Sequence, residues 1–202
     1  MLTDDLREYL DTAYLAKLPH LAVAHPKLAV VFSGGNAVGK STMSRAIQER
    51  FHGLVIENDG IKRTILKREP DFVWEKLNPV TWAYTTELYR RLGSISPNGL
   101  LVRDGVVDWY YDRIFPILKE SGYELFIIEY DLSHEKQVAL IEARGDTETF
   151  TAERALEILG DHAVHQKEFR SRHKADVVLT DDTVFDTDLV LEKLEKRLAS
   201  MQ

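Results

Sequence analysis

Residues 28–42 read LAVVFSGGNAVGKST, so that a short apolar run leads directly into a glycine-rich segment. The run from Leu28 to Phe32 predicts a buried strand, and the residues from Thr42 onward predict a helix. Between them the sequence fits the pattern G-x-x-x-x-G-K-[ST] in the order strand, turn, helix that the pattern requires. A glycine-rich turn with an incidental lysine is the alternative, and the complete pattern in its complete context argues against it. The stretch predicts an α/β fold.

The glycine-rich turn predicts a binding site for the phosphates of a nucleotide. Glycine lets the backbone approach a phosphate closely, and free N–H groups at a helix start attract anions. The side chain of Lys40 is expected to reach the β- and γ-phosphates of ATP, and the Ser41 hydroxyl is expected to bind Mg²⁺. The predicted nucleotide-binding residues are Gly34, Gly35, Asn36, Ala37, Val38, Gly39, Lys40, Ser41 and Thr42.

Composition limits the classes of protein that this chain can represent. The 202 residues, of which 44% are hydrophobic, predict a single domain over residues 1–202. A formal net charge of -7 argues against a nucleic-acid-binding protein, although a 5′-hydroxyl end as a substrate stays open. Cysteine is absent, no run approaches the roughly 20 apolar residues of a membrane span, and the acidic start MLTDDLREYL lacks a signal-peptide core. We expect a soluble, cytoplasmic protein without a membrane partner.

Strand and helix patterns alternate along the chain. The pattern predicts strands at 28–32, 53–58, 100–104, 124–130 and 175–179. It predicts helices at 3–18, from 42, at 61–67, 79–92 and 109–121, after Ser133, and at 187–200. Such alternation predicts a parallel sheet with right-handed crossovers. Residues 1–27 form an N-terminal helical extension in this prediction and pack on the outside of the domain.

Residues 145–174 differ from the rest, because they carry many cations among short helical stretches. Two interpretations stay open for this segment: a mobile lid over the phosphates, or a solvated helical face. The cations are Arg154, Lys167, Arg170, Arg172 and Lys174.

The motifs that are missing narrow the chemistry of nucleotide use. No N-K-x-D or T-K-x-D segment follows a late strand, which argues against a GTPase. Asp104 is followed by glycine rather than a second acid, which argues against ATP hydrolysis for mechanical work. A kinase remains, and Asp59 at the end of the second predicted strand provides a carboxylate that can orient an acceptor hydroxyl. Lys62 and Arg63 follow one turn later and can hold the acceptor or the transferring group. Asp59 as a helix N-cap is the alternative.

The chain resembles the small P-loop kinases grouped with zeta toxins, chloramphenicol phosphotransferase, gluconate and shikimate kinases and polynucleotide 5′-kinase. The resemblance covers about residues 28–182 and rests on the loop at 34–42 and the D-x-x-K pattern from Asp59. It implies a three-layer P-loop NTPase fold with a five-stranded parallel sheet in the order 2-3-1-4-5, helices on both faces and a helical lid.

The same resemblance implies roles for individual residues. Asp59 would act on the acceptor hydroxyl, with Lys62 where relatives carry arginine. Asp104 would lie near Mg²⁺ or the acceptor, with Asp108 as a companion. Arg144 would close on the phosphates, and the adenine would rest near it and the loop at 180–183. A second lid arginine has no assigned counterpart, and Arg103 inside the third strand is atypical of the group.

Aromatic residues border the expected acceptor side, where they can stack on a sugar or base or serve packing alone. They are Trp74, Trp82, Tyr84, Trp109, Tyr110 and Tyr111, and the run from Trp109 is the best candidate to reach the acceptor. His162, His165 and His173 lack the spacing of a metal site and are expected to be surface or packing residues.

These observations together predict a kinase that transfers the γ-phosphoryl group of Mg-ATP to a hydroxyl of a small molecule. Its predicted catalytic residues are Lys40, Asp59 and Arg144. The acceptor would be a sugar, a nucleoside or nucleotide, or an antibiotic-like compound, and its site would include Asp59, Lys62, Arg63, Asp104 and Trp109. Two alternatives stay open: an ATP-binding regulator without acceptor chemistry, and a zeta-toxin-like kinase of nucleotide sugars. The sequence does not predict the oligomeric state.

Overall fold

A five-stranded parallel sheet forms the centre of the computed structural model, which describes residues 2–18, 25–95, 99–148 and 151–202. The strands lie in the order β2-β3-β1-β4-β5, which confirms the predicted topology. Their bounds are β1 Leu28–Ser33, β2 Leu54–Glu57, β3 Leu100–Val106, β4 Glu124–Tyr130 and β5 Val177–Leu179. The strand that precedes the glycine-rich loop therefore lies in the middle of the sheet.

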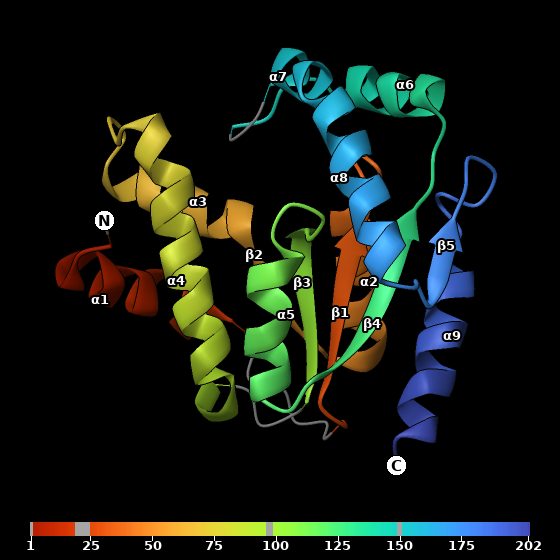
Figure 1. Cartoon of the computed structure of the whole chain (residues 1–202). Coiled ribbons are helices and arrows are strands. Elements are labelled where there is room, and N and C mark those ends of the chain that lie inside the picture. The colour runs from red at the N-terminus through yellow and green to blue at the C-terminus, as the bar shows by residue number, and fades with distance from the viewer. Residues whose placement is uncertain (1, 19–24, 96–98, 149–150) are drawn as a thin grey trace.

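Helices cover both faces of this sheet and give the predicted three layers (Figure 1). All six residues of β1 are buried, and they alternate between two hydrophobic cores as a strand covered on both faces requires. Ala29 and Val31 face the core formed with α4 (Trp74–Ile95) and α5 (Tyr111–Glu120). Val30 and Phe32 face the core formed with α2 (Lys40–Phe51) and α9 (Thr187–Ser200). No helix in the described part of the chain is long and apolar enough to cross a membrane.

Three helices lie beyond the carboxyl ends of the central strands (Figure 1). They are α6 (His134–Arg144), α7 (Ala152–Glu157) and α8 (Leu159–Arg172). The second half of α8 is fixed to the body of the domain, because Phe169 is fully buried in the core and Gln166 donates a hydrogen bond of 2.9 Å to the backbone of Tyr130. The second half of α8 therefore belongs to the body of the domain, and the candidate lid predicted at 145–174 does not include it.

The N-terminal extension packs beside β2, at one edge of the sheet. It consists of α1 (Asp4–Ala13), which Thr3 caps as predicted, and a short 3₁₀ turn, Leu15–Lys17. The hydroxyl of Tyr14 accepts a hydrogen bond of 2.9 Å from the backbone N–H of Glu57 and donates one of 3.3 Å to its carbonyl oxygen. Tyr14 therefore satisfies backbone groups of the edge strand that no neighbouring strand reaches.

The bounds of three helices differ from the sequence prediction in ways that affect the site. Helix α3 spans Asn58–Arg68, so Asp59 lies in its first turn and not ahead of it. Gly60 lies inside this helix, and an added Cβ there would lie 3.1 Å from the Tyr14 ring, so this glycine permits close packing. Helix α4 begins five residues before Pro79, and α5 begins at Tyr111, which leaves Trp109 in the preceding turn.

Candidate active site

A cavity of about 940 Å³ opens at the carboxyl ends of β1, β2 and β3. Seven of the nine predicted loop residues, 36–42, line it, whereas Gly34 and Gly35 are absent from its wall. Asp59, Lys62, Arg63, Asp104, Trp109 and Arg144 also line it, so the fold brings all the remaining predicted site residues together. This is the edge of a parallel sheet where ligands usually bind.

The glycine-rich loop turns through backbone conformations that L-residues rarely adopt. Gly34 has φ +120°, Ala37 has φ +62°, and Gly39 has φ +97° immediately before α2 begins at Lys40. The N–H of Gly34 donates a hydrogen bond of 2.8 Å to the buried carboxylate of Asp108. Asp108 does not line the cavity and instead holds the base of the loop. The turn is therefore fixed from behind while its other side faces the cavity.

Replacing Gly34 by alanine is expected to destabilise the fold. A Cβ at this position would lie 2.9 Å from the Cβ of Tyr130 and 3.0 Å from its carbonyl oxygen, and the positive φ adds strain. Because backbone cannot move aside cheaply, we expect the free energy of unfolding to fall by about 2 kcal/mol or more in urea titrations.

Gly160→Ala in α8 is the matched control for this substitution, since no atom lies within 4 Å of the added Cβ. This control is expected to be neutral or stabilising. Equal unfolding midpoints for Gly34→Ala and the unmodified chain would contradict the steric argument.

Lys40 begins α2 and points its ammonium back across the loop. Its Nζ donates to the carbonyl oxygens of Gly34, at 3.4 Å, and Gly35. Burial of the ammonium lowers the pKa of Lys40 to about 8, while the carboxylates of Asp104 and Asp108 act in the opposite direction. A phosphate group close to Lys40 would favour its charged form. The loop therefore holds a partly desolvated cation for which an anion is the natural partner.

Asp104 and Ser41 place oxygen ligands beside Lys40. Burial raises the pKa of Asp104, and the neighbouring Ser41 hydroxyl and Lys40 ammonium counteract this effect. The carboxylates of Glu57 and Asp59 raise the pKa further, so a divalent cation would relieve their repulsion. The described residues contain no group of three or more His, Asp or Glu side chains placed to hold a metal ion. Mg²⁺ does not need such a group, because it keeps several waters and binds phosphate oxygens, and one carboxylate with one hydroxyl fits it.

The first turn of α3 carries Asp59 and Lys62 on the same side, and the two side chains form an ion pair with an N–O distance of 3.3 Å. Asp59 is half-exposed, and the cap position of α3 belongs to Glu57, so the alternative of Asp59 as N-cap is wrong. Arg63 pairs instead with Glu57 at 3.1 Å. Lys62 is therefore the cation next to the Asp59 carboxylate. The sequence had left open whether Lys62 or Arg63 takes this place.

Two arginines reach the cavity from the helices beyond the strand ends. Arg144 ends α6, and its charge contributes to lowering the pKa of Lys40. Arg154 of α7 also lines the cavity and forms an ion pair of 2.7 Å with Glu157. Arg154 is thus a candidate for the second lid arginine, which the sequence could not assign.

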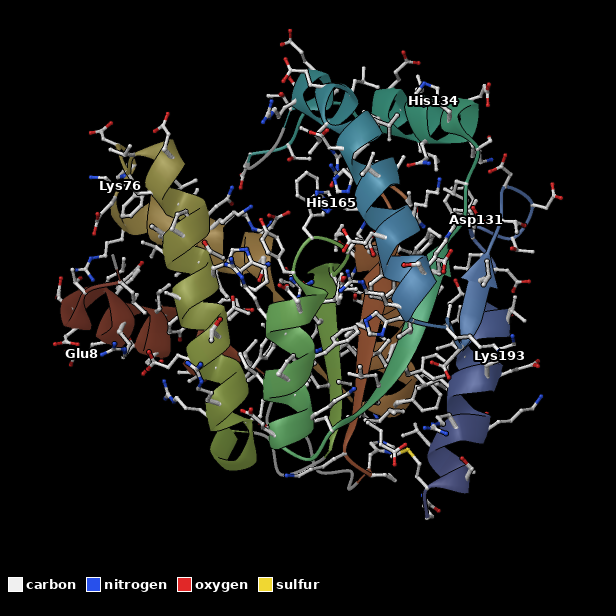
Figure 2. All side chains as sticks on the ribbon, viewed as in Figure 1. Glu8, Lys76, Asp131, His134, His165 and Lys193 are labelled. Carbon is white, nitrogen blue, oxygen red and sulfur yellow. The ribbon has the colours of Figure 1, made fainter. Side chains whose placement is uncertain are left out.

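His162 is a site residue that the sequence analysis missed. It is 6% exposed, lines the cavity, and accepts a hydrogen bond of 3.0 Å from the indole N–H of Trp109 at Nδ1. Its Nε2 lies 3.3 Å from the side-chain amide of Asn36 in the loop. Since indole only donates, neutral His162 carries its proton on Nε2 and the Asn36 amide should present its oxygen. His165, labelled in Figure 2, packs its ring on Trp109 with centroids 4.2 Å apart. His162 and His165 both pack on Trp109, as expected of packing residues, and His162 also lines the cavity.

The burial of His162 predicts a dependence of stability on pH. Burial, with the charge of Lys40, lowers the pKa of His162 to about 4. In the unfolded chain the imidazole of His162 takes up a proton near pH 6.5, whereas in the folded chain it stays neutral until the pH approaches 4. The stability that neutral His162 contributes is therefore complete above pH 6.5 and is lost as the pH falls towards 4. We expect urea titrations to lose up to about 3 kcal/mol from this group over that range.

His162→Asn is the matched control for the pH titration, because it keeps an acceptor for Trp109 without a titrating ring. The pH profile of this variant is expected to be flatter than that of the unmodified chain. Identical profiles for the two chains would contradict the assignment.

The other aromatic candidates separate into cavity and core residues. Trp82 and Tyr110 line the cavity with ring centroids 4.2 Å apart. Tyr84 is buried away from it and donates to Asp11 at 2.8 Å, and Tyr111 packs on Phe169. The side chain of Trp74 lies outside the described residues.

No model of a known protein family matches the sequence, and no curated protein matches it significantly. Solved structures do match the fold. A chain of the PezAT chromosomal toxin–antitoxin system of Streptococcus pneumoniae has a TM-score of 0.59 at 19% identity, over 91% of this chain and 80% of its own.

Two solved kinase structures match the fold similarly. A shikimate kinase from Bacteroides thetaiotaomicron has a TM-score of 0.54 at 10% identity, over 84% of this chain and 98% of its own. A gluconokinase from Sinorhizobium meliloti has a TM-score of 0.53 at 17% identity, over 89% and 97%. Together with the loop at 34–42 and the strand order, these likenesses show that the chain has the fold of the small P-loop kinases.

Proposed function

We propose that this chain is a kinase that transfers the γ-phosphoryl group of Mg-ATP to an alcohol hydroxyl of a small molecule. One observation carries the proposal: a single cavity contains both Lys40 with the glycine-rich loop and the Asp59–Lys62 ion pair of α3. A nucleotide-binding protein without a second substrate has no need of a carboxylate and a cation beside the phosphate site. A phosphoryl transferase needs both.

On the nucleotide side, the loop and the cations beyond the strand ends would share the phosphate charge. The loop amides and Lys40 would hold the phosphates at the start of α2. Arg144, which ends α6 and lines the same cavity, would stabilise charge on the transferring group. Phe185, which lines the cavity and is 65% exposed, offers an aromatic face to the base and lies just beyond the predicted loop at 180–183.

Mg²⁺ would be held by the Ser41 hydroxyl and the Asp104 carboxylate. When bound, this ion neutralises phosphate charge and orients the phosphates for in-line transfer. The proximity of Ser41 and Asp104 supports this role, as does the all-oxygen chemistry of the pair.

On the acceptor side, Asp59 would accept the proton of the attacking hydroxyl and orient its oxygen. Asp59 lines the cavity and pairs with Lys62 at 3.3 Å, so a carboxylate and a cation lie together where an acceptor hydroxyl would bind. Lys62 would also approach the acceptor or the transferring group, and Trp109 would form part of the acceptor wall.

The proposal is tested by incubating the full chain with γ-labelled ATP, Mg²⁺ and pooled acceptors. The pools contain sugars, sugar acids, nucleosides, antibiotics and 5′-hydroxyl oligonucleotides. We expect label in a product that retains the acceptor, and transfer by Asp59→Asn that is lowered at least about a hundredfold. An ATP-binding regulator would bind Mg-ATP in calorimetry and label nothing, and that result would contradict the kinase proposal.

A second candidate is a toxin-like kinase, because the chain shares its fold over most of its length with a chain of the PezAT toxin–antitoxin system. Growth arrest on expression that is relieved by Asp59→Asn would favour this candidate. Normal growth at the same expression level would argue against it.

A further inference from the structure

Arg103 is a buried cation that the proposed mechanism does not use. It lies on β3 and follows Leu101 on the face of the sheet that packs on α4, and its side chain is 1% exposed. Its Nη1 donates a hydrogen bond of 3.0 Å to the carbonyl oxygen of Val106. Its Cζ lies 5.5 Å from the centre of the Trp82 ring. Its Nε has no hydrogen-bond partner among the described residues.

Within the described part of the chain, no neighbouring acid balances the charge of Arg103. The other cations on this side of the cavity are paired, Lys62 with Asp59 and Arg63 with Glu57. Among the residues that the structure describes, no carboxylate forms an ion pair with Arg103. The Tyr89 hydroxyl lies beside the guanidinium, which counteracts the rise in the pKa of Tyr89 caused by burial. Burying a cation without a counter-charge is costly, so the arrangement is incomplete without an anion.

The backbone next to Arg103 leaves room for the guanidinium. Gly105 has φ +157°, and an added Cβ there would lie 2.9 Å from Nη1 of Arg103. The glycine therefore lets the chain pass directly against the cation, at the point where β3 ends in the cavity wall.

Arg103 and Thr81 both line the cavity that contains Asp59. Thr81 is 1% exposed, and its hydroxyl, like the Nε of Arg103, has no hydrogen-bond partner among the described residues. The rings of Trp82 and Tyr110, which are tilted against each other, form the wall beside them. Two buried polar groups without partners thus meet the same cavity, and almost all of Arg103 lies beneath other side chains. A compact ligand group with several hydrogen-bond acceptor oxygens suits this part of the cavity better than the ring of a sugar or base does.

The charge of the side chains that line the whole cavity also favours an anionic ligand. Seven Lys and Arg side chains line it against three carboxylates among the described residues, in a protein whose net charge is -7. The phosphates of ATP would take up charge near Lys40 and Arg144, and Arg103 lies with Thr81 and Trp82 on the wall formed by β3 and α4. An anionic acceptor would complete the charge balance of the cavity.

We propose that the acceptor carries a compact oxyanion, a carboxylate or a phosphate, that binds Arg103 and Thr81 while its hydroxyl meets Asp59. The identification of the ligand as an acceptor rests on the proposed function, but binding of an anion to Arg103 and Thr81 can be tested without any phosphoryl transfer. A guanidinium that gains a charge-assisted, two-pronged contact discriminates an anion from its neutral analogue by about tenfold to a hundredfold. The acceptor class is therefore hydroxy acids or phosphorylated alcohols, and neutral polyols are poor substrates.

The test of the anion site uses the full chain saturated with Mg-ADP, so that the phosphate loop is occupied. The Nε–H resonance of Arg103 is followed by NMR and assigned by its loss in Arg103→Lys. The probes are glycerate and glycerol 3-phosphate against glycerol, and gluconate and glucose 6-phosphate against glucose. We expect a saturable shift with at least one anion and none with its neutral partner, and the anion that binds distinguishes carboxylate from phosphate. No saturable shift with any anion, or equal shifts with the neutral probes, would overturn the proposal.

Two variants separate the anion site from general folding effects. Arg103→Met is expected to weaken binding of the anionic probe by at least about tenfold. Gly105→Ala keeps the charge but displaces the guanidinium, and it should act in the same direction even if Arg103→Met fails to fold. Arg90→Met, exposed on α4 and outside the cavity, is the control and should bind as the unmodified chain does. Unchanged anion binding in folded Arg103→Met or Gly105→Ala would refute the assignment.

The same probes as acceptors distinguish this inference from the proposed function. Label transferred to glycerol or glucose as readily as to the anionic partners would leave the kinase proposal intact and remove the anion site. Saturable anion binding at Arg103 without any transfer to a broad acceptor panel would leave the anion site intact and remove the kinase proposal.

Discussion

Lys40→Ala is expected to lower phosphoryl transfer by about a thousandfold or more and to weaken Mg-ATP binding by about tenfold to a hundredfold. The ammonium is the only side-chain cation of the glycine-rich loop at 34–42, and it crosses the loop to the carbonyl oxygens of Gly34 and Gly35. Loss of the ammonium removes a positive charge beside the phosphates in both the ground state and the transition state, so the Mg-ATP affinity and the transfer rate both fall. Calorimetry with Mg-ATP and a labelled-transfer assay measure them separately.

Arg50→Ala is the matched control for Lys40→Ala. Arg50 lies on the same helix α2, outside the cavity, in a surface ion pair of 3.3 Å with Glu195. Such a pair contributes little to stability, so both affinity and transfer should remain unchanged. A Lys40→Ala chain that still binds Mg-ATP with full affinity would show that the nucleotide lies elsewhere.

Asp59→Asn is expected to lower transfer by about a hundredfold to ten-thousandfold while Mg-ATP affinity changes by less than about threefold. The amide keeps the size of the side chain but cannot accept the hydroxyl proton. Asp59 is half-exposed and contacts Lys62, not the loop, so the nucleotide site should be preserved. The measurement is single-turnover transfer with saturating Mg-ATP, alongside calorimetry.

Asp71→Asn serves as the control for Asp59→Asn, since Asp71 is exposed beyond the end of α3 and outside the cavity. Full transfer by Asp59→Asn would remove the base assignment. An equal loss in both variants would point to a general effect of surface charge.

Local patterns in the sequence were sufficient to predict the strand, the glycine-rich turn and the helix start within residues 28–42. The apolar run at 28–32, the glycines and Lys40 are neighbours in sequence, so their order in the chain already describes their arrangement in space. Ser133 as a helix cap and the closing helix at 187–200 were predicted for the same reason and are confirmed. The strand order followed from the resemblance to P-loop kinases and is also confirmed.

Long-range contacts account for what the sequence analysis missed. His162 reaches Trp109 across 53 positions and Asn36 across 126, so no spacing in its own segment marks it as a site residue. Arg103 interrupts an apolar strand, and only the packing of α4 reveals that it is buried without an acidic partner. The close neighbour that explains Gly60 inside α3 is Tyr14, 46 positions earlier in the chain.

The two hydrogen bonds between Tyr14 and the backbone of Glu57 have a consequence for how this chain behaves when shortened. Without Tyr14 the outer backbone of β2 would be bare, and a bare strand can recruit the same strand of another molecule. A chain that lacks residues 1–14 should therefore self-associate through intermolecular sheet extension, even though it retains the glycine-rich loop at 34–42. The segment that carries Tyr14 is thus expected to prevent self-association as well as to pack on the domain.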